Sequence, residues 1–279
     1  MPGTLYVVAT PIGNLGDLSP RAREVLSSVA LVAGETQEST LRLLSAAGIR
    51  GPRFVLYQER NREQSAQRLL EALEQGESVA LVSDGGTPAI SDPGRELVDR
   101  AHRAGIPVRA VAGPSSVTAA LSVSGLKVRR FAFEGFLPRK SSERRALLRS
   151  LQTESRALVF FEAPHRIEES LADLRATFPA RRLSVSRELT KLHEETLIDP
   201  DIVRAQGEFC IVVEEAPEQV APEVDPMALE GLLELKLGSR VSARILELFA
   251  GLSHKTAYRM IVEKREAEGD PPADMENNS

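Results

Sequence analysis

Short apolar runs alternate with segments of helical periodicity in the first part of the chain, and this alternation constrains the fold more than any other feature. The apolar runs, each expected to form a buried strand, are residues 5–9, 29–33, 54–57, 79–82 and 108–111. The segments of helical periodicity are residues 21–28, 39–47, 64–74 and 95–103. Strands that are separated by helices pair in parallel through crossover connections. The sequence therefore predicts an α/β domain with a parallel sheet over residues 1–121, in which a last helix begins near Ser115.

The pattern becomes less regular after Gly125, which predicts a second α/β domain with a mixed sheet over residues 122–215. Its expected strands are residues 130–136, 157–161, 183–185 and 209–213, and its expected helices are residues 143–151 and 167–176, with a shorter segment at 195–203. An acidic, proline-bearing linker follows at residues 216–226. A helical unit is expected at 227–268, with helices at 229–237, 241–248 and 255–265 arranged as in a helix-turn-helix. Residues 269–279 are predicted to be disordered.

Composition excludes several classes of protein. Aromatic residues make up only 4% of the chain and Trp is absent, which argues against broad stacking platforms for single-stranded nucleic acid. A net charge of −5 argues against a chain that is basic throughout. The single cysteine, Cys210, cannot form an internal disulfide and is expected to be a buried thiol. No signal peptide or apolar stretch of about 20 residues is present, so we expect a cytoplasmic protein that does not span a membrane.

One loop is expected to bind a small molecule. Residues 83–94, with the sequence SDGGTPAISDPG, directly follow the apolar run at 79–82. Loops at the carboxyl ends of parallel strands are where open α/β sheets bind ligands. Asp84 and Asp92 would repel a phosphate, so a cationic or hydroxyl-rich ligand is expected. The alternative is that both aspartates only bond loop amides, as Asp often does in turns.

The sequence of a second loop, residues 10–18, argues against a dinucleotide as that ligand. Ser19 and Pro20 begin the next helix as N-cap and first helical residue, too late for the helix to hold a pyrophosphate. The motif G-x-G-x-x-G is absent and Asp17 would repel the phosphates, although Glu35 lies where a ribose-binding acid belongs. S-adenosylmethionine fits better, because it lacks phosphate, carries a positive sulfonium and needs close approach of the backbone.

Five motifs together resemble the tetrapyrrole methylase superfamily: LYVVATPIGNLGD at 5–17, VSDGGTPAISDPG at 82–94, GPSS at 113–116, FEGFLP at 133–138 and GEFCIVVE at 207–214. The resemblance covers residues 4–265. Within the superfamily the chain is most similar to members that methylate a ribose 2′-hydroxyl of a decoding-centre cytidine in 16S rRNA of the small ribosomal subunit. The resemblance implies two α/β domains with S-adenosylmethionine in the cleft between them, and a homodimer.

By position in these motifs, the resemblance implies a set of cofactor-binding residues. They are Pro11, Asp84, Gly85, Gly86, Thr87, Pro88, Ala89, Ser115, Ser116 and Phe136. The chain departs from the family at Ala33-Gly34-Glu35-Thr36, where members commonly have A-E-D-T. One carboxylate is therefore lost and the other lies on a longer side chain, which puts a role for that acidic pair in doubt.

Two residues are candidates for a general base that removes the hydroxyl proton. His165 follows a second-domain strand and has a suitable pKa, but it could equally cap the next helix. Glu188 follows another strand, and an ion pair with the adjacent Arg187 is the alternative to a base. No metal is expected, because the four histidines lack the spacing of metal ligands.

RNA contacts are expected at a basic cluster directly after FEGFLP. Arg139, Lys140, Arg144, Arg145 and Arg149 against Glu143 give this segment a net charge of +4, and Arg166 is added to the predicted RNA-binding residues. A solvated helix face is the alternative. Two other functions stay open: methylation of a small tetrapyrrole, and non-catalytic ligand sensing by an RNA-binding protein. The helix-turn-helix-like unit could also be a packing bundle or a dimer contact.

Overall fold

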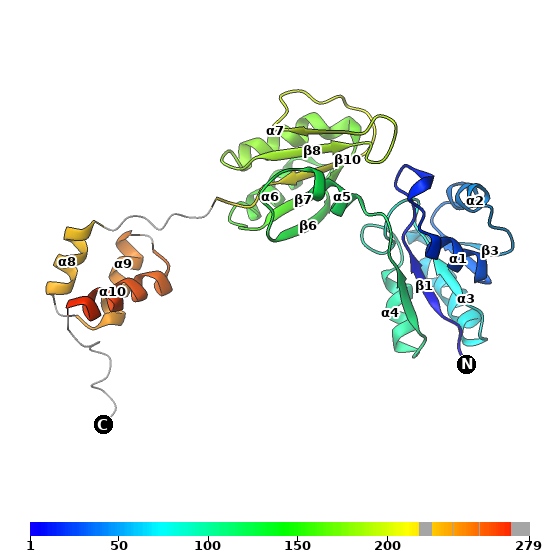
Figure 1. The fold of residues 1–279 in the computed structure, drawn as a ribbon, viewed down its shortest axis with the longest axis horizontal. Helices are drawn as coiled ribbons and strands as arrows, with labels where there is room; N and C mark the ends of the chain where they lie inside the picture. The colour runs from blue at the N-terminus through cyan, green and yellow to red at the C-terminus, as the bar shows by residue number, and fades with distance from the viewer. Residues whose placement is uncertain (218–224, 236, 251, 269–279) are drawn as a thin grey trace. The chain divides into compact units, whose positions relative to one another are not determined.

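A computed structural model describes residues 1–217, 225–235, 237–250 and 252–268. It divides into two compact units, Met1–Ala216 and Pro217–Ser279. Figure 1 shows the chain coloured from its N-terminus to its C-terminus, with the elements labelled. The first unit contains two sheets, whereas the described part of the second contains only helices, and each unit is described by itself.

The first sheet is entirely parallel, as the alternating pattern predicts. Its strand order is β3-β2-β4-β1-β5. Leu5 lies opposite Val79 on one side and Val108 on the other, so β4 and β5 flank the same central strand, β1. The strands are β1 (Leu5–Val8), β2 (Leu31–Gly34), β3 (Arg53–Leu56), β4 (Val79–Leu81) and β5 (Val108–Val111).

Helices cover both faces of this sheet, and each face has its own apolar core. The helices are α1 (Pro20–Ser28), α2 (Gln37–Ala46), α3 (Arg62–Glu74) and α4 (Arg95–Arg103), with short 3-10 turns η1 (Leu15–Asp17) and η2 (Glu59–Asn61). Residues of α3 and α4 pack on one face, and residues of α1 and α2 on the other. The predicted cap of α1 is confirmed, because the Ser19 hydroxyl accepts a hydrogen bond from the Ala22 amide at 3.1 Å.

The second sheet is mixed, as predicted, with strand order β6-β7-β10-β8-β9. Only β6 and β7 pair in parallel, and the other pairs of this sheet are antiparallel. The strands are β6 (Phe131–Phe136), β7 (Ala157–Glu162), β8 (Leu183–Arg187), β9 (Glu195–Ile198) and β10 (Phe209–Val213). The sequence did not predict β9, because its pairing with β8 depends on contacts such as the bond between the Ser186 and Thr196 hydroxyls at 2.9 Å.

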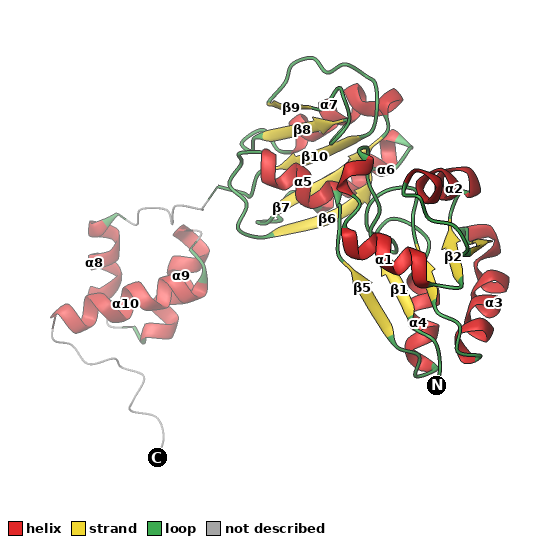
Figure 2. Ribbon diagram, turned by 45° about the vertical axis from the view of Figure 1, so that its right-hand side comes forward, coloured by secondary structure: helices red, strands yellow, loops and turns green. Residues whose placement is uncertain are grey.

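Helices again cover the two faces of the second sheet. α6 (Ser141–Ser150) and α7 (Ile167–Thr177), with η3 (Pro164–Arg166), cover one face. α5 (Ser116–Val123) covers the other face (Figure 2). There Val117 and Ala120 pack with Cys210 and Val212. The sequence grouped α5 with the first domain, which was expected to end at residue 121. Its packing instead joins it to the second sheet, so α5 links the two sheets of this unit.

The second unit is a small helical unit with its own core. Its helices are α8 (Pro226–Glu234), α9 (Ser239–Ala250) and α10 (His254–Glu268), which matches the three predicted helices. The buried Arg265 donates hydrogen bonds to the Ser239 hydroxyl and the Leu237 carbonyl. Most of the predicted linker, residues 218–224, and the predicted disordered tail, residues 269–279, lie outside the described residues. Among the helices that are described, none is long and apolar enough to cross a membrane.

The turn into α4 depends on Gly94, and this predicts a measurable cost of substitution. Gly94 has φ of 147°, and a Cβ there would lie 2.7 Å from Leu81 Cδ2 and 3.1 Å from Ala89 Cβ. We expect Gly94→Ala to lower the free energy of unfolding by roughly 2–4 kcal/mol, from backbone strain and overpacking together. Urea denaturation followed by circular dichroism measures this.

Gly105→Ala is the matched control for this prediction. Gly105 also has positive φ, at 67°, but a Cβ there would have no atom within 4 Å. That substitution should therefore cost only about 1–2 kcal/mol, from the left-handed backbone alone. Equal losses in the two variants would show that the contacts of Gly94 contribute nothing.

Candidate functional site

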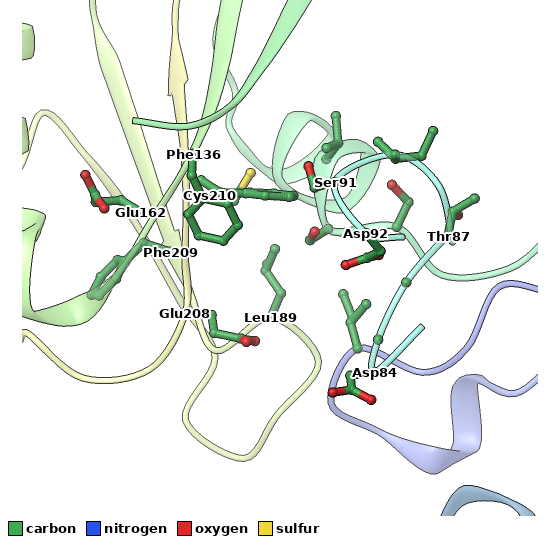
Figure 3. Close-up of a pocket in the computed structure, with 18 of the residues that line it drawn as sticks. Asp84, Thr87, Ser91, Asp92, Phe136, Glu162, Leu189, Glu208, Phe209 and Cys210 are labelled. Carbon is green, nitrogen blue, oxygen red and sulfur yellow. The ribbon is translucent and has the colours of Figure 1, made fainter. Parts of the chain in front are cut away.

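A cavity of about 250 Å³ lies between loops at the ends of the two sheets of the first unit. The loop after β4 lines it from the first sheet, and the start of α5 adds to the lining. From the second sheet, the ends of β6 and β7, the turn after β8 and the start of β10 line it. Figure 3 shows Thr87, Ser91 and Asp92 on one side, and Phe136 and Cys210 on the other.

Backbone hydrogen bonds join the two glycine-rich loops of the first sheet. Thr10 and Gly86 exchange amide-to-carbonyl hydrogen bonds, both of 2.9 Å. The Thr10 hydroxyl donates to the Ser83 carbonyl at 3.2 Å, and the Thr87 hydroxyl donates to the Pro114 carbonyl at 3.3 Å. Three loops that are far apart in the sequence thus form one continuous wall of the cavity.

Seven of the ten predicted cofactor-binding residues line the cavity: Asp84, Gly85, Gly86, Thr87, Ser115, Ser116 and Phe136. The other three, Pro11, Pro88 and Ala89, do not. The Pro11 carbonyl packs against Gly85, Pro88 is buried, and Ala89 has φ of 67° and packs against Gly94. These three residues shape the loops from behind instead of facing the cavity.

The helix that was expected near Ser115 is α5, which begins at Ser116. Ser115 occupies the N-cap position of α5, but its hydroxyl makes no capping hydrogen bond. The residue lines the cavity instead.

The first-sheet side of the site carries several carboxylates close together. Burial raises the pKa of Asp92, and the charges of Asp84 and Glu208 add to this, although a hydrogen bond with Ser83 opposes it. Burial also raises the pKa of Glu35, as do the charges of Asp84 and Asp92. Asp84 accepts a hydrogen bond of 2.6 Å from the Thr36 hydroxyl. Because like charges destabilise one another, this side of the site favours a cationic ligand.

Aromatic side chains form the apolar part of the opposite wall. A register shift between Phe133 and Gly135 marks a bulge near the end of β6, just before Phe136. Phe136 is 58% exposed, and its ring meets Phe161 edge-on, with centroids 5.4 Å apart. Cys210 also lines the cavity and is buried, as predicted.

The turn after β8 places Lys191 on the cavity beside Glu188, and the sequence pattern did not single out this lysine. Lys191 Nζ donates a 2.8 Å hydrogen bond to Glu188 Oε1 and lies 3.6 Å from Glu208 Oε2. Glu188 therefore pairs with Lys191, while Arg187 pairs with Glu195 at 2.6 Å. The predicted ion pair of Glu188 with Arg187 is wrong. Gly207 within the GEFC motif was the available signal, because it leaves room for the Glu188 side chain.

His165 is exposed and does not line the cavity. The alternative prediction, that His165 caps a helix, is wrong, because neither η3 nor α7 has a side-chain cap hydrogen bond. Of the two predicted base candidates, the cavity contains only Glu188.

The predicted basic cluster is only partly a surface. Arg144 is 1% exposed and donates to Asp173 Oδ2 at 2.7 Å, so its charge is neutralised inside the protein. The Arg166 side chain is 12% exposed and pairs with Glu162 at 2.5 Å. We therefore assign both residues to structural ion pairs, and not to the RNA contacts that the sequence predicted.

The remaining residues of the basic cluster are exposed on or beside α6. Arg139 and Arg149 have no ion pair among the described residues, whereas Lys140 pairs with Glu143 at 3.0 Å and Arg145 lies 3.9 Å from Asp173. Within the ranges that the structure describes, no three His, Cys, Asp or Glu side chains gather as a metal site would require.

Comparisons with known proteins agree with the fold. The family described as tetrapyrrole (corrin/porphyrin) methylases matches residues 4–200. A ribosomal RNA small subunit methyltransferase I from Xylella fastidiosa (strain Temecula1) is 45% identical over 269 residues, which is 92% of this chain and 98% of that protein. The protein of that name from Pseudomonas aeruginosa is 41% identical over 277 residues, with coverage of 94% and 98%.

Solved structures show the same fold at lower identity. Diphthine synthase superposes with a TM-score of 0.61 at 17% identity, over 83% of this chain and 94% of that one. A uroporphyrin-III C-methyltransferase from Thermus thermophilus, in complex with S-adenosylhomocysteine, has a TM-score of 0.52 at 20% identity, over 75% and 96%.

The environment of Cys210 predicts that its thiol is unreactive. Burial raises the pKa of Cys210 to about 12, so at mildly alkaline pH almost all of it stays protonated, and only the thiolate is nucleophilic. Alkylation of the native protein should be at least about 1,000-fold slower than that of an ordinary free cysteine. Mass spectrometry of iodoacetamide-treated protein measures the rate. Unfolding in guanidinium chloride should restore ordinary reactivity, and equal rates in the two states would contradict the burial.

Proposed function

Because the chain belongs to the tetrapyrrole methylase family, and within it to the ribosomal RNA small subunit methyltransferase I proteins, we propose the corresponding reaction for it. It transfers a methyl group from S-adenosylmethionine to the ribose 2′-hydroxyl of a decoding-centre cytidine in 16S rRNA. The acceptor is the assembled or nearly assembled small ribosomal subunit. We further propose that the protein works in the cytoplasm as a homodimer.

The acidic, glycine-lined cavity is the observation that carries this proposal. Gly85 and Gly86 have no side chains to keep a ligand from the backbone, and Asp84 and Asp92 supply negative charge. These features suit a ligand that carries a sulfonium and an amino group, and they disfavour a phosphate. When bound, S-adenosylmethionine supplies an electrophilic methyl group.

The second wall of the cavity supports a separate place for the acceptor. The exposed ring of Phe136 offers an apolar surface, and the turn with Glu188 and Lys191 offers polar groups. A ribose hydroxyl is a weak nucleophile, so holding it in line with the methyl group supplies much of the rate. Arg139 and Arg149, both exposed, have the charge needed to hold the RNA backbone.

A transfer assay with three acceptors tests the proposal. The protein is incubated with S-adenosylmethionine labelled in its methyl group, and with undermethylated small subunits, naked 16S rRNA or a precorrin. We expect label in the subunits, at a cytidine 2′-oxygen when the RNA is digested and analysed by mass spectrometry. Label in the precorrin would overturn the RNA assignment in favour of a tetrapyrrole methylase. No label in any acceptor, with the methyl donor still bound, would instead indicate a ligand sensor.

The exposed arginines predict how RNA binding responds to charge. Reversing Arg139 and Arg149 to Glu should weaken binding to small subunits about 10-fold or more and reduce its salt dependence, because two phosphate contacts are lost. Filter binding across a salt series measures both effects. Arg109→Glu is the control, since Arg109 is also exposed but lies on β5 of the first sheet. Equal losses in the control would show a general charge effect and contradict this surface.

A further inference from the structure

The turn from Glu188 to Lys191 is held in a strained backbone conformation. Glu188 has φ of 51° and Thr190 has φ of 65°, values that residues with a side chain rarely adopt. The Glu188 amide donates to the Glu208 carbonyl at 3.2 Å, and the Lys191 amide donates to the Glu188 carbonyl at 2.9 Å. Strained residues that the surroundings hold in place gather at functional sites, so this turn calls for a functional explanation.

Two glycines leave the space that the turn occupies. A Cβ at Gly207 would overlap the Glu188 carboxylate, with Glu188 Cγ and Cδ both at 2.5 Å. A Cβ at Gly13 would overlap the Lys191 side chain and lie 2.9 Å from the Leu189 carbonyl oxygen. Gly207 precedes a strand of the second sheet and Gly13 lies in the loop after β1, so both sides of the cavity make room for this one pair.

Five carboxylates of the described chain line the cavity, and their surroundings distinguish them. Glu162 is buried and accepts hydrogen bonds from the Ala163 amide and the Ser170 hydroxyl and an ion pair from Arg166, which occupy both of its oxygens. Asp84 and Asp92 lie on the side proposed for the methyl donor. The Glu208 side chain is 88% exposed at the rim.

Glu188 is the remaining carboxylate, and its geometry differs from that of the others. Its side chain is 21% exposed, and Lys191 binds its Oε1. The backbone amide of Glu208 also stabilises the charged carboxylate and lowers its pKa. Glu188 is therefore held in place by Lys191, and unlike the buried Glu162 it is still partly open to the cavity.

We propose that Glu188 accepts the proton of the acceptor hydroxyl, and that Lys191 is the positioning residue that holds the carboxylate in its strained place on the cavity. This inference rests on the proposed function, because it assigns the base for that reaction. It extends the function by giving Lys191 a role that the sequence pattern did not suggest.

The reaction is a nucleophilic substitution at the methyl carbon. A lone pair of the ribose 2′-oxygen forms the new C–O bond, and the C–S bond breaks with its electron pair left on sulfur. The hydroxyl proton passes to the Glu188 carboxylate and then to solvent. The oxygen becomes strongly acidic as the C–O bond forms, so a carboxylate is basic enough to take the proton late in the step.

The charged groups around Glu188 keep it ionised. The hydrogen bond from Lys191 lowers the pKa of Glu188 most, and the charges of Lys191 and Arg187 add to this, although burial opposes it. Burial would lower the pKa of Lys191, but its bond to Glu188 and the charge of Glu208 raise it overall. The acids facing this pair from the other loop are Asp84 and Asp92. Glu188 is therefore ready to accept a proton at neutral pH and below.

Three variants test the assignment, each with small subunits as acceptor and wild-type protein as reference. Glu188→Gln should lower kcat about 100-fold or more, with the affinity for S-adenosylmethionine unchanged in calorimetry. Lys191→Met should lower kcat by about 10-fold. It should also move the acid limb of the pH–rate profile to higher pH, because the pKa of Glu188 rises when Lys191 no longer stabilises its charged form. Lys191→Arg should restore most of the rate and the wild-type profile.

Glu195→Gln is the matched control. It makes the same chemical change on β9, seven residues from Glu188, at a side chain that does not line the cavity, and it should keep the wild-type rate. Wild-type kcat in Glu188→Gln would overturn the base assignment. An unmoved pH profile in Lys191→Met would overturn the positioning role. Failure of the wild-type protein itself to methylate any RNA would be a failure of the proposed function, and is thus distinguished from both.

Discussion

The reciprocal backbone hydrogen bonds between Thr10 and Gly86 are the contact on which the site depends. They join the loop after β1 to the loop after β4, two segments separated by more than seventy residues of sequence. Because β1 and β4 are parallel neighbours, their loops leave the sheet at the same edge and come within bonding distance. Ordinary chain geometry thus builds one wall of the cavity, and the short side chains of these loops keep that wall open to a ligand.

The opposite wall depends on a different property of sheets. β10 runs antiparallel to both β7 and β8, and Phe209 lies opposite Glu162 on one side and Arg187 on the other. The start of β10 therefore meets the ends of its two neighbours. This places Glu162, Glu188 and Glu208 around the same cavity, although no two of them are close in the sequence. The differences among these carboxylates come from their hydrogen-bond partners and exposure.

Not every residue of the basic cluster lies on the surface of the protein. The predicted basic cluster counts Arg144 with its neighbours, yet helical geometry points Arg144 inward, where Asp173 neutralises it. Arg166 likewise pairs with the buried Glu162. A buried arginine is stable only when its charge is paired, so acidic residues on the neighbouring α7 and β7 decided which cations reach solvent. Only the exposed members can attract a polyanion.

The sequence by itself determined the parallel first sheet, the mixed second sheet, the three C-terminal helices and most of the glycine-lined wall of the cavity. Each follows from local periodicity or from the composition of a loop. Both are properties of residues that are neighbours in the sequence. Tertiary structure alone decided the strand β9, the placement of α5 against the second sheet, the burial of Arg144 and the pairing of Glu188 with Lys191. Each of these depends on which strands pair, which face of an element is covered or how a turn is held. Spacing along the chain does not encode such contacts, because they arise only when the strands have paired.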